Sequence, residues 1–241
     1  MIAGDKVVNI MSDVKNTNEK ITEHIETLKN RRKDHIDLLG KILETDNRAL
    51  YGVDLVVIAV TQRSISLIDG FTKMVEDRNY LCANALLRLQ LDNIIRLYAC
   101  WLVEDPHSIA LVLLEGKPLN KVKSRENKTL SDSYLVSEAS KLYPWLKLVY
   151  EKTSGFVHLS QPHMLAYLTE ITEDGILEIQ VGKGLGREWK EEEVFESVSA
   201  FGEATACVLH LCYSWMITKD VASKKRMGSP VSYPSDAVFL R

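Results

Sequence analysis

Three side chains able to take part in acid–base chemistry recur at intervals of four in this sequence. They are Tyr150, Ser154 and His158. A spacing of four places residues on one face of a helix. A phenol, a hydroxyl and an imidazole on one face form either a structural hydrogen-bond ladder or part of a functional site. Of the three groups, only the imidazole changes its charge near neutral pH.

A second set of polar residues, Arg88, Asp92 and Arg96, has the same spacing on a helix predicted at 79–103. On an exposed face such a ladder contributes a few tenths of a kcal/mol per pair. This helix carries few other charges, so we expect part of the ladder to face inward. A buried charge without a partner costs several kcal/mol. An inward ladder therefore needs polar partners on another helix.

The face that carries Tyr150 and His158 can supply those partners. If Asp92 accepts a hydrogen bond from a ring N–H of His158, it fixes the tautomer of that imidazole. Arg88 or Arg96 can then bind the hydroxyl groups. Two faces that meet in this way form either a structural network or a functional site. The remaining alternative is that they never meet.

The overall composition is that of a folded domain whose total charge favours no particular partner. The chain has 241 residues, of which 46% are hydrophobic and 26% charged, and its net charge is −3. This charge predicts no general attraction to nucleic acid or to an acidic membrane, although it permits a local basic patch. No apolar run reaches the roughly 20 residues of a membrane span, and no signal peptide opens the chain. We therefore expect a cytoplasmic protein without a membrane partner.

The cysteines and histidines form no recognisable metal or redox motif. The cysteines stand in apolar helical contexts without a CxxC pair, which favours buried thiols over disulfides or zinc ligands. His158 and His163 are five residues apart across a proline, a poor spacing for a metal without a nearby carboxylate. We expect neither a metal nor a cofactor. The four cysteines are Cys82, Cys100, Cys207 and Cys212.

Apolar residues recur at helical spacing through most of the chain and predict a helical bundle. The polar helix expected at 5–45 has only a thin apolar stripe, which indicates an exposed or partner-packed arm. The stripe is interrupted by the basic cluster Lys29–Lys33, which is either a solvated face or a phosphate contact. Further helices are expected at 49–76, 79–103, 109–114, 135–142, from Pro144 onward, and at 190–219.

Two segments have non-helical patterns. Residues 116–133 form a polar, basic loop, whose first residue, Gly116, should end the preceding helix. Ser131 or Asp132 at the end of this loop can cap the next helix. Asp174-Gly175 between two alternating apolar runs predicts a β-hairpin at 165–181.

The chain can be divided by these patterns into an N-terminal helical arm at 1–48, a helical bundle with the hairpin at 49–220 and a flexible tail at 221–241. The glycines of 182–186 lack a phosphate-binding pattern, so we expect a plain loop there.

Two motifs together resemble those of a known family. The first is a Leu-x-Arg-x-x-x-Asp-x-x-x-Arg face that ends at Arg96, and the second is Tyr-x-x-x-Ser-x-x-x-His-x-Ser, which begins at Tyr150. With the hairpin and the long closing helix, they resemble bacterial HEPN-like helical proteins of uncharacterised or abortive-infection type over about residues 50–218. The resemblance implies a mainly α, up-and-down bundle, frequently dimeric.

The resemblance also implies a chemistry. Many HEPN members are metal-independent RNases of toxin–antitoxin or antiviral defence systems, with an Arg-x(4–6)-His motif paired across the dimer. The two side chains promote attack of a ribose 2′-OH on its own phosphate in single-stranded RNA. This chain departs from that motif, because no arginine stands four to six residues before His158. Lys152 gives Lys-x5-His, but lysine lacks the bidentate fork of arginine. Arg88 or Arg96 can substitute for it only in space.

Three hypotheses follow. The first is a HEPN-like protein with a degenerate nuclease site, which binds protein, RNA or nucleotide in a bacterial defence or toxin–antitoxin context. The second is a metal-independent RNase that uses His158 together with Lys152, Arg88 or Arg96. The third is a structural scaffold that assembles through residues 5–45. A homodimer or a partner protein bound through the helices is expected. The expected catalytic residues are His158, Lys152, Ser154 and Tyr150, and the expected substrate-binding residues are Arg88, Asp92 and Arg96.

Overall fold

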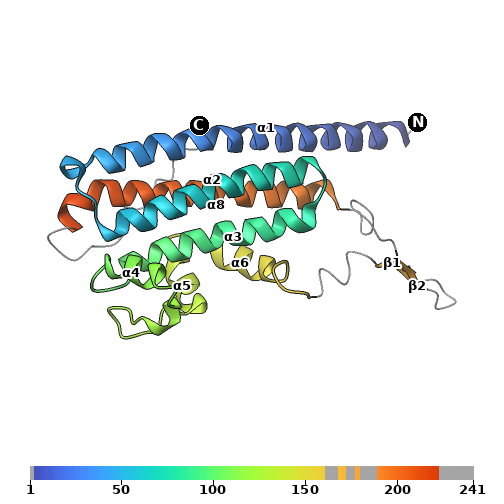
Figure 1. Ribbon diagram of the computed structural model, residues 1–241. Coiled ribbons are helices and arrows are strands. Elements are labelled where there is room, and N and C mark those ends of the chain that lie inside the picture. The colour runs from blue at the N-terminus through green and yellow to red at the C-terminus, as the bar shows by residue number, and fades with distance from the viewer. Residues whose placement is uncertain (1–2, 161–167, 172–176, 180–188, 223–241) are drawn as a thin grey trace.

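The protein is mainly α-helical. The computed structural model describes residues 3–160, 168–171, 177–179 and 189–222, with backbone alone for 3–16, the two strand segments and 220–222. Four long helices lie side by side in a bundle (Figure 1). They are α1 (Ala3–Glu44), α2 (Gly52–Glu76), α3 (Tyr80–Tyr98) and α8 (Glu191–Ala222).

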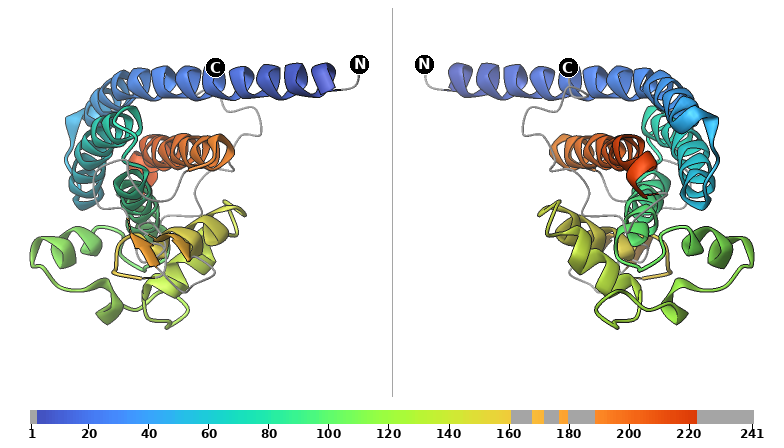
Figure 2. Two further views of the ribbon diagram at one scale, coloured as in Figure 1. Left: turned by 90° about the vertical axis from the view of Figure 1, so that its right-hand side faces the viewer. Right: turned by 90° about the vertical axis from the view of Figure 1, so that its left-hand side faces the viewer.

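Three short helices lie on the side of the bundle that faces away from α1, where the first packs on α2 and the other two pack on α3 (Figure 2). They are α4 (Ser108–Leu114), α5 (Asp132–Ala139) and α6 (Leu146–Ser154). Single 3-10 turns complete the helical part: η1 (Asp46–Arg48), η2 (Ala99–Trp101) and η3 (Leu119–Lys121).

The core lies between α2, α3 and α8. The rings of Phe71 and Phe201 stack at the centre with centroids 3.9 Å apart. The middle of α3 is fully buried at Leu91 and Ile94, as expected for the apolar face of a central helix. This burial fixes the rotation of α3 about its axis and therefore decides where Arg88, Asp92 and Arg96 emerge.

Helix α1 packs on α8 and α2 from about Ile21 onward. Leu28, Leu38 and Ile42 are buried on one face, so the predicted apolar stripe contacts helices of the same chain from Ile21 onward. The basic cluster forms ion pairs with α2, since Lys29 lies 3.1 Å from Glu76 and Arg32 lies 3.2 Å from Asp69. Toward its N-terminus α1 extends beyond the other helices (Figure 1).

Two predicted helix ends are confirmed. Gly116 ends α4 with a φ of +66°, a conformation that favours glycine. Ser131 is the N-cap of α5 and accepts a hydrogen bond from the backbone of Tyr134. The helix predicted at 79–103 ends earlier, because α3 stops at Tyr98 and continues as the tighter turn η2.

Two short strands pair antiparallel within the predicted 165–181 segment. They are β1 (Leu168–Ile171) and β2 (Leu177–Ile179), with Leu168 opposite Ile179 and Ile171 opposite Leu177. The residues of the predicted turn between them lie outside the described residues, as do 182–186 and the predicted tail beyond Ala222.

The prediction of four buried thiols is wrong for one of them. Cys100, Cys207 and Cys212 are buried, and burial raises the pKa of Cys100 and of Cys212 to about 12. Cys82 is exposed, because the first turn of α3 presents this position to solvent while Ala83 faces the core.

One helix among the described residues, α2, is long and apolar enough to cross a membrane by length and composition. Half of its most apolar stretch is buried inside the fold. The core helix of a bundle is also long and apolar, so it meets the same criteria of length and composition.

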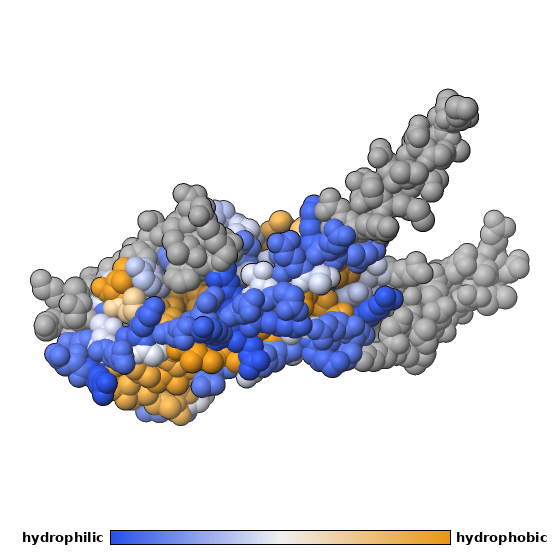
Figure 3. Space-filling model, turned by 90° about the horizontal axis from the view of Figure 1, so that it is seen from above, coloured by the Kyte–Doolittle hydropathy of each residue, from blue (hydrophilic) through white to orange (hydrophobic). Residues whose placement is uncertain are grey.

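Seen from the α1 side, most of the surface is hydrophilic, and apolar residues gather at the end of the bundle that carries α4 (Figure 3).

Candidate functional site

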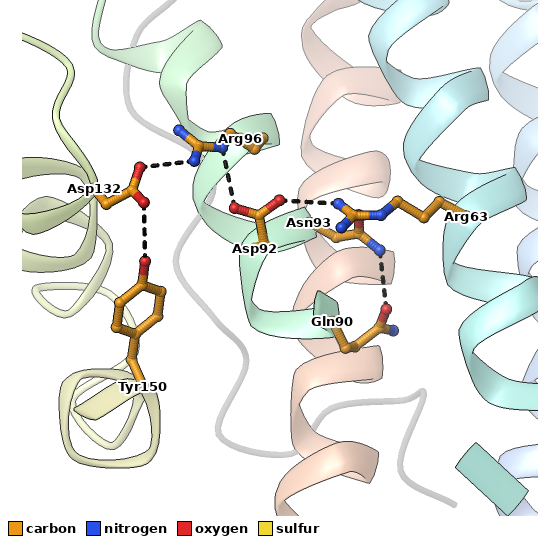
Figure 4. A network of polar contacts seen from close by, with 7 residues as sticks. All are labelled: Arg63, Gln90, Asp92, Asn93, Arg96, Asp132 and Tyr150. Atoms are coloured by element: carbon orange, nitrogen blue, oxygen red, sulfur yellow. Dashed lines mark hydrogen bonds and ion pairs between the residues drawn. The ribbon is translucent and has the colours of Figure 1, made fainter. Parts of the chain in front are cut away.

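A chain of polar contacts begins at Asp92 on α3 (Figure 4). The carboxylate of Asp92 accepts hydrogen bonds from Arg63 of α2 at 2.9 Å and from Arg96, one turn along α3, at 3.1 Å. The side chain of Asp92 is only 20% exposed. Two guanidinium groups therefore satisfy a carboxylate that would be costly to bury alone.

Arg96 carries the network to the short helices. Its guanidinium donates to Asp132 at the start of α5 at 2.7 Å, and the hydroxyl of Tyr150 on α6 donates to the same carboxylate at 3.4 Å. The guanidinium of Arg88 lies over the ring of Tyr150, 3.4 Å from its centroid, in a cation–π contact. Helices α3, α5 and α6 are thus joined by polar contacts (Figure 4).

The charges of this network shift two pKa values. Burial lowers the pKa of Arg96, but the carboxylates of Asp92 and Asp132 more than offset it, so the pKa rises above its ordinary value. Burial raises the pKa of Tyr150, and the two carboxylates raise it further, against the opposing effect of Arg88. Arg96 and the Tyr150 phenol therefore keep their protons at neutral pH.

A second branch of the network enters the core. Arg63 also donates to the Asn93 side-chain oxygen at 2.9 Å, and Asn93 donates to Gln90 at 3.0 Å. Gln90 donates to Ser64 at 2.7 Å. The Ser64 hydroxyl lies 2.9 Å from Nε2 of the buried His35. These residues come from α1, α2 and α3, so one polar seam runs from His35 to Tyr150.

The tautomer of His35 follows from its two neighbours. Nδ1 lies 2.7 Å from the carbonyl oxygen of Arg31, which can only accept, so Nδ1 carries the proton and Nε2 accepts from Ser64. Burial lowers the pKa of His35. The seam therefore starts at a neutral imidazole.

The predicted contact between Asp92 and His158 is not formed, because Asp92 is taken by Arg63 and Arg96. The expectation that one helix carries Tyr150, Ser154 and His158 is wrong for the histidine. Helix α6 ends at Ser154, and Gly155 follows as its C-cap. His158 lies beyond that end, exposed, with no hydrogen bond to any other described residue.

The other two predicted catalytic residues are also apart from the seam. Lys152 is exposed, and the Ser154 hydroxyl donates to the carbonyl oxygen of Tyr150 within its own helix at 2.7 Å. The helices that carry the two predicted faces do pack together through Arg88 and Tyr150. The structure thus brings Arg88, Asp92, Arg96 and Tyr150 together. The other three predicted residues, His158, Lys152 and Ser154, do not join this network.

Sequence reasoning missed several members of the seam. The sequence offered one indication of Arg63, because it is the only cation of α2 before Lys73. Gln90 and Asn93 gave a second indication, because they stand three residues apart inside the apolar pattern of α3. Amide side chains at buried positions need hydrogen-bond partners. Asp132 was recognised only as a possible cap. No sequence pattern predicts that it pairs with Arg96, 36 residues away.

A pocket of about 420 Å³ opens beside the Arg96–Asp132 pair. That volume falls within the range of small-molecule sites. Its polar groups are two cations, one carboxylate, one amide and one hydroxyl, and the rest of its wall is apolar. The lining residues are Arg96, Leu113, Lys117, Pro118, Leu119, Asn120, Ser131 and Asp132.

A separate buried ion pair lies where α2 begins and α8 ends. Lys219 and Asp54 are both 0% exposed, with Nζ 3.2 Å from Oδ2. Lys219 also donates to the carbonyl oxygen of Ile42, and Trp215 donates its indole N–H to Asp54. Both charged groups have hydrogen-bond partners and are buried away from solvent. The cluster therefore connects α1, α2 and α8.

Among the described residues, no group of three His, Cys, Asp or Glu side chains could hold a metal ion. Comparison of the chain with protein-family models, with curated proteins and with solved structures finds no match.

Proposed function

We propose that the protein binds a nucleoside phosphate, either free or within single-stranded RNA, in the pocket beside Arg96. The observation that carries this proposal is the composition of the pocket wall. Two cations, Arg96 and Lys117, share it with one carboxylate, Asp132, and with the apolar side chains of Leu113 and Pro118. Each part of a nucleotide has a chemical counterpart in that set.

The cations would contact the phosphate. Arg96 can present a guanidinium edge, and Lys117 an ammonium group that pairs with Glu115 at 2.6 Å on a side chain that is 65% exposed. Asp132 would accept from a ribose hydroxyl, as carboxylates do in dinucleotide sites. The apolar wall would lie against the base. The seam keeps Arg96 in place, because Asp92 holds the other side of its guanidinium.

The proposed role is binding without catalysis. The only histidine predicted to be catalytic, His158, is exposed beyond the end of α6, and Asp132 rather than His158 faces Arg96. Within the HEPN-like hypothesis, this favours the degenerate form over the RNase, that is, a binding protein in a bacterial defence or toxin–antitoxin context. That context rests on the resemblance of the two sequence motifs alone.

The test is equilibrium binding of labelled nucleoside triphosphates and of a labelled single-stranded oligoribonucleotide, followed by fluorescence anisotropy. We expect saturable binding of at least one probe, with competition by unlabelled ribonucleotide. Weaker competition by the 2′,3′-dideoxy nucleotide would support the role of Asp132. Absence of saturable binding by all probes up to millimolar protein would refute the proposal.

Intact RNA after prolonged incubation is the expected result for the binding role. The variant His158→Ala should bind the probes with unchanged affinity. Cleavage of the oligoribonucleotide by the wild type but not by His158→Ala would instead establish the RNase hypothesis.

A further inference from the structure

Helix α4 presents leucines to solvent. Leu111 is 62% exposed and Leu114 is 71% exposed, and a spacing of three places them on one side of the helix. In the part of the chain that the structure describes, no element covers them. A seven-residue helix with two leucines this exposed is unusual for a surface that stays in water.

The leucines are followed at once by a basic loop. Lys121, Lys123 and Lys128 are exposed. Arg125 differs from them, because its guanidinium donates to the carbonyl oxygen of Val103 at 2.8 Å and anchors the loop to the bundle. Residues 108–128, named here the α4 lobe, hold five cations and two carboxylates, a net charge of +3 in a chain whose net charge is −3.

The α4 lobe stands at the edge of the molecule. It projects from the bundle on the side away from α1 (Figures 1 and 2). Apolar surface gathers at the end of the bundle where the lobe lies (Figure 3). A partner can therefore approach the lobe from outside the bundle (Figure 2).

The composition of the lobe favours a lipid surface over a protein. Lysine is depleted in protein interfaces, and their hot spots are enriched in Trp, Tyr and Arg rather than leucine. The lobe contains no aromatic residue, and its one arginine is held by the backbone. Exposed aliphatic side chains beside lysines match a bilayer with anionic headgroups, where the leucines enter the acyl boundary and the lysines face the phosphates.

We propose that the α4 lobe docks on an anionic lipid surface, with Leu111 and Leu114 inserted and Lys121, Lys123 and Lys128 against the headgroups. The inference goes beyond the proposed function. The lobe contains one charged group of the pocket, Lys117, and the proposed docking does not use it. Each lysine near an anionic bilayer raises the partition coefficient about fivefold. The attraction is screened by salt over about 10 Å at 0.1 M.

The test is sedimentation of the full chain with vesicles of phosphatidylcholine alone or with 30 mol% phosphatidylserine (about one anionic lipid in three). We expect binding to the anionic vesicles, weakened by salt, and little binding to the neutral ones. The triple variant Lys121→Gln/Lys123→Gln/Lys128→Gln should bind about 100-fold more weakly. The matched control is Lys141→Gln, since Lys141 is an exposed lysine outside the lobe.

A second pair of variants tests the leucines. Leu111→Ser/Leu114→Ser should abolish vesicle binding, whereas Leu148→Ser, at a leucine of α6 that is 59% exposed, should not. Circular dichroism melting of each variant checks the fold. Equal binding by the lobe variants and the controls, or no binding to anionic vesicles, would overturn the proposal.

Two other measurements separate the alternatives. If light scattering gives a dimer for the wild type and a monomer for Leu111→Ser/Leu114→Ser, a second copy covers the leucines and the proposal is wrong. Nucleotide binding should be unchanged in both lobe variants. Loss of vesicle binding and loss of nucleotide binding therefore report on different proposals.

Discussion

Arg96 of α3 and Asp132 of α5 form an ion pair at 2.7 Å, although 36 residues separate them in the chain. The pair fixes the first turn of α5 against the central helix and forms one wall of the pocket. On its other side Arg96 holds Asp92. A single guanidinium therefore joins the interior of the bundle to its candidate binding site.

The two carboxylates that contact Arg96 should differ in their effect on stability. Asp92 is 20% exposed and binds two arginines, whereas Asp132 is 51% exposed. We expect Asp92→Asn to lower the free energy of unfolding by about 1–3 kcal/mol, and Asp132→Asn to lower it by less than about 1 kcal/mol. Urea denaturation of both variants measures the difference. Equal losses would contradict the seam as a buried structural unit.

The buried pair of Lys219 and Asp54 should behave as one unit. Lys219→Met leaves a fully buried carboxylate with only Trp215 and the backbone of Tyr51 as donors. We expect a loss of about 3–5 kcal/mol. Lys219→Met/Asp54→Asn should lose less than the sum of the single variants in a double-mutant cycle. Additive losses would show that the two groups do not interact.

The pH dependence of stability should report on His35. Burial lowers its pKa below the ordinary 6.5, so below 6.5 the unfolded chain binds a proton more readily than the folded chain. The contribution of His35 to the free energy of unfolding is therefore complete above its unfolded-state pKa of 6.5. It is lost as the pH falls through the lower pKa that His35 has in the folded chain.

The variant His35→Gln can keep a hydrogen bond to Ser64 but cannot titrate. We expect its stability, measured by urea denaturation at a series of pH values, to fall less steeply below pH 6.5 than that of the wild type. If the free energy of unfolding depends on pH in the same way for both proteins, His35 does not contribute to the pH dependence of stability.

Two glycines should respond to alanine in opposite ways. A Cβ on Gly40 in α1 would meet nothing within 4 Å, whereas one on Gly52 would lie 2.6 Å from the carbonyl oxygen of His107. We expect Gly40→Ala to stabilise the protein by about 0.5–1 kcal/mol. Gly52→Ala should destabilise it by about 1–3 kcal/mol. Thermal unfolding distinguishes them, and destabilisation by both would contradict the packing at Gly52.

Much of the helical architecture could be predicted from the sequence, because helical periodicity is a local property. The apolar spacing located α2 and α8, and Ser131 and Gly116 marked helix ends through their own backbone preferences. The end of α6 was missed, since the spacing of Tyr150, Ser154 and His158 continues past the point where Gly155 and the following turn end the helix.

The candidate site was only partly predictable, because its geometry depends on tertiary packing. Spacing alone placed Arg88, Asp92 and Arg96 on one face, and the packing of α3 on α6 then brought Tyr150 to them. The partner of Asp92 is Arg63 rather than His158. The rotation of each helix about its axis decides which cation pairs with a given carboxylate. A local sequence pattern does not predict that rotation.

The most direct test of nucleotide binding compares two lysines. Lys117 and Lys141 have equally exposed side chains, at 65%, and each pairs with a glutamate, at 2.6 and 2.7 Å. Only Lys117 lines the pocket. Titration calorimetry with the best-bound nucleotide should show at least about a fivefold weaker affinity for Lys117→Ala, since a hydrogen bond to a charged group contributes about 1.5–3 kcal/mol before exposure reduces it. Lys141→Ala should bind like the wild type. Equal affinities for all three proteins would contradict a phosphate site beside Arg96.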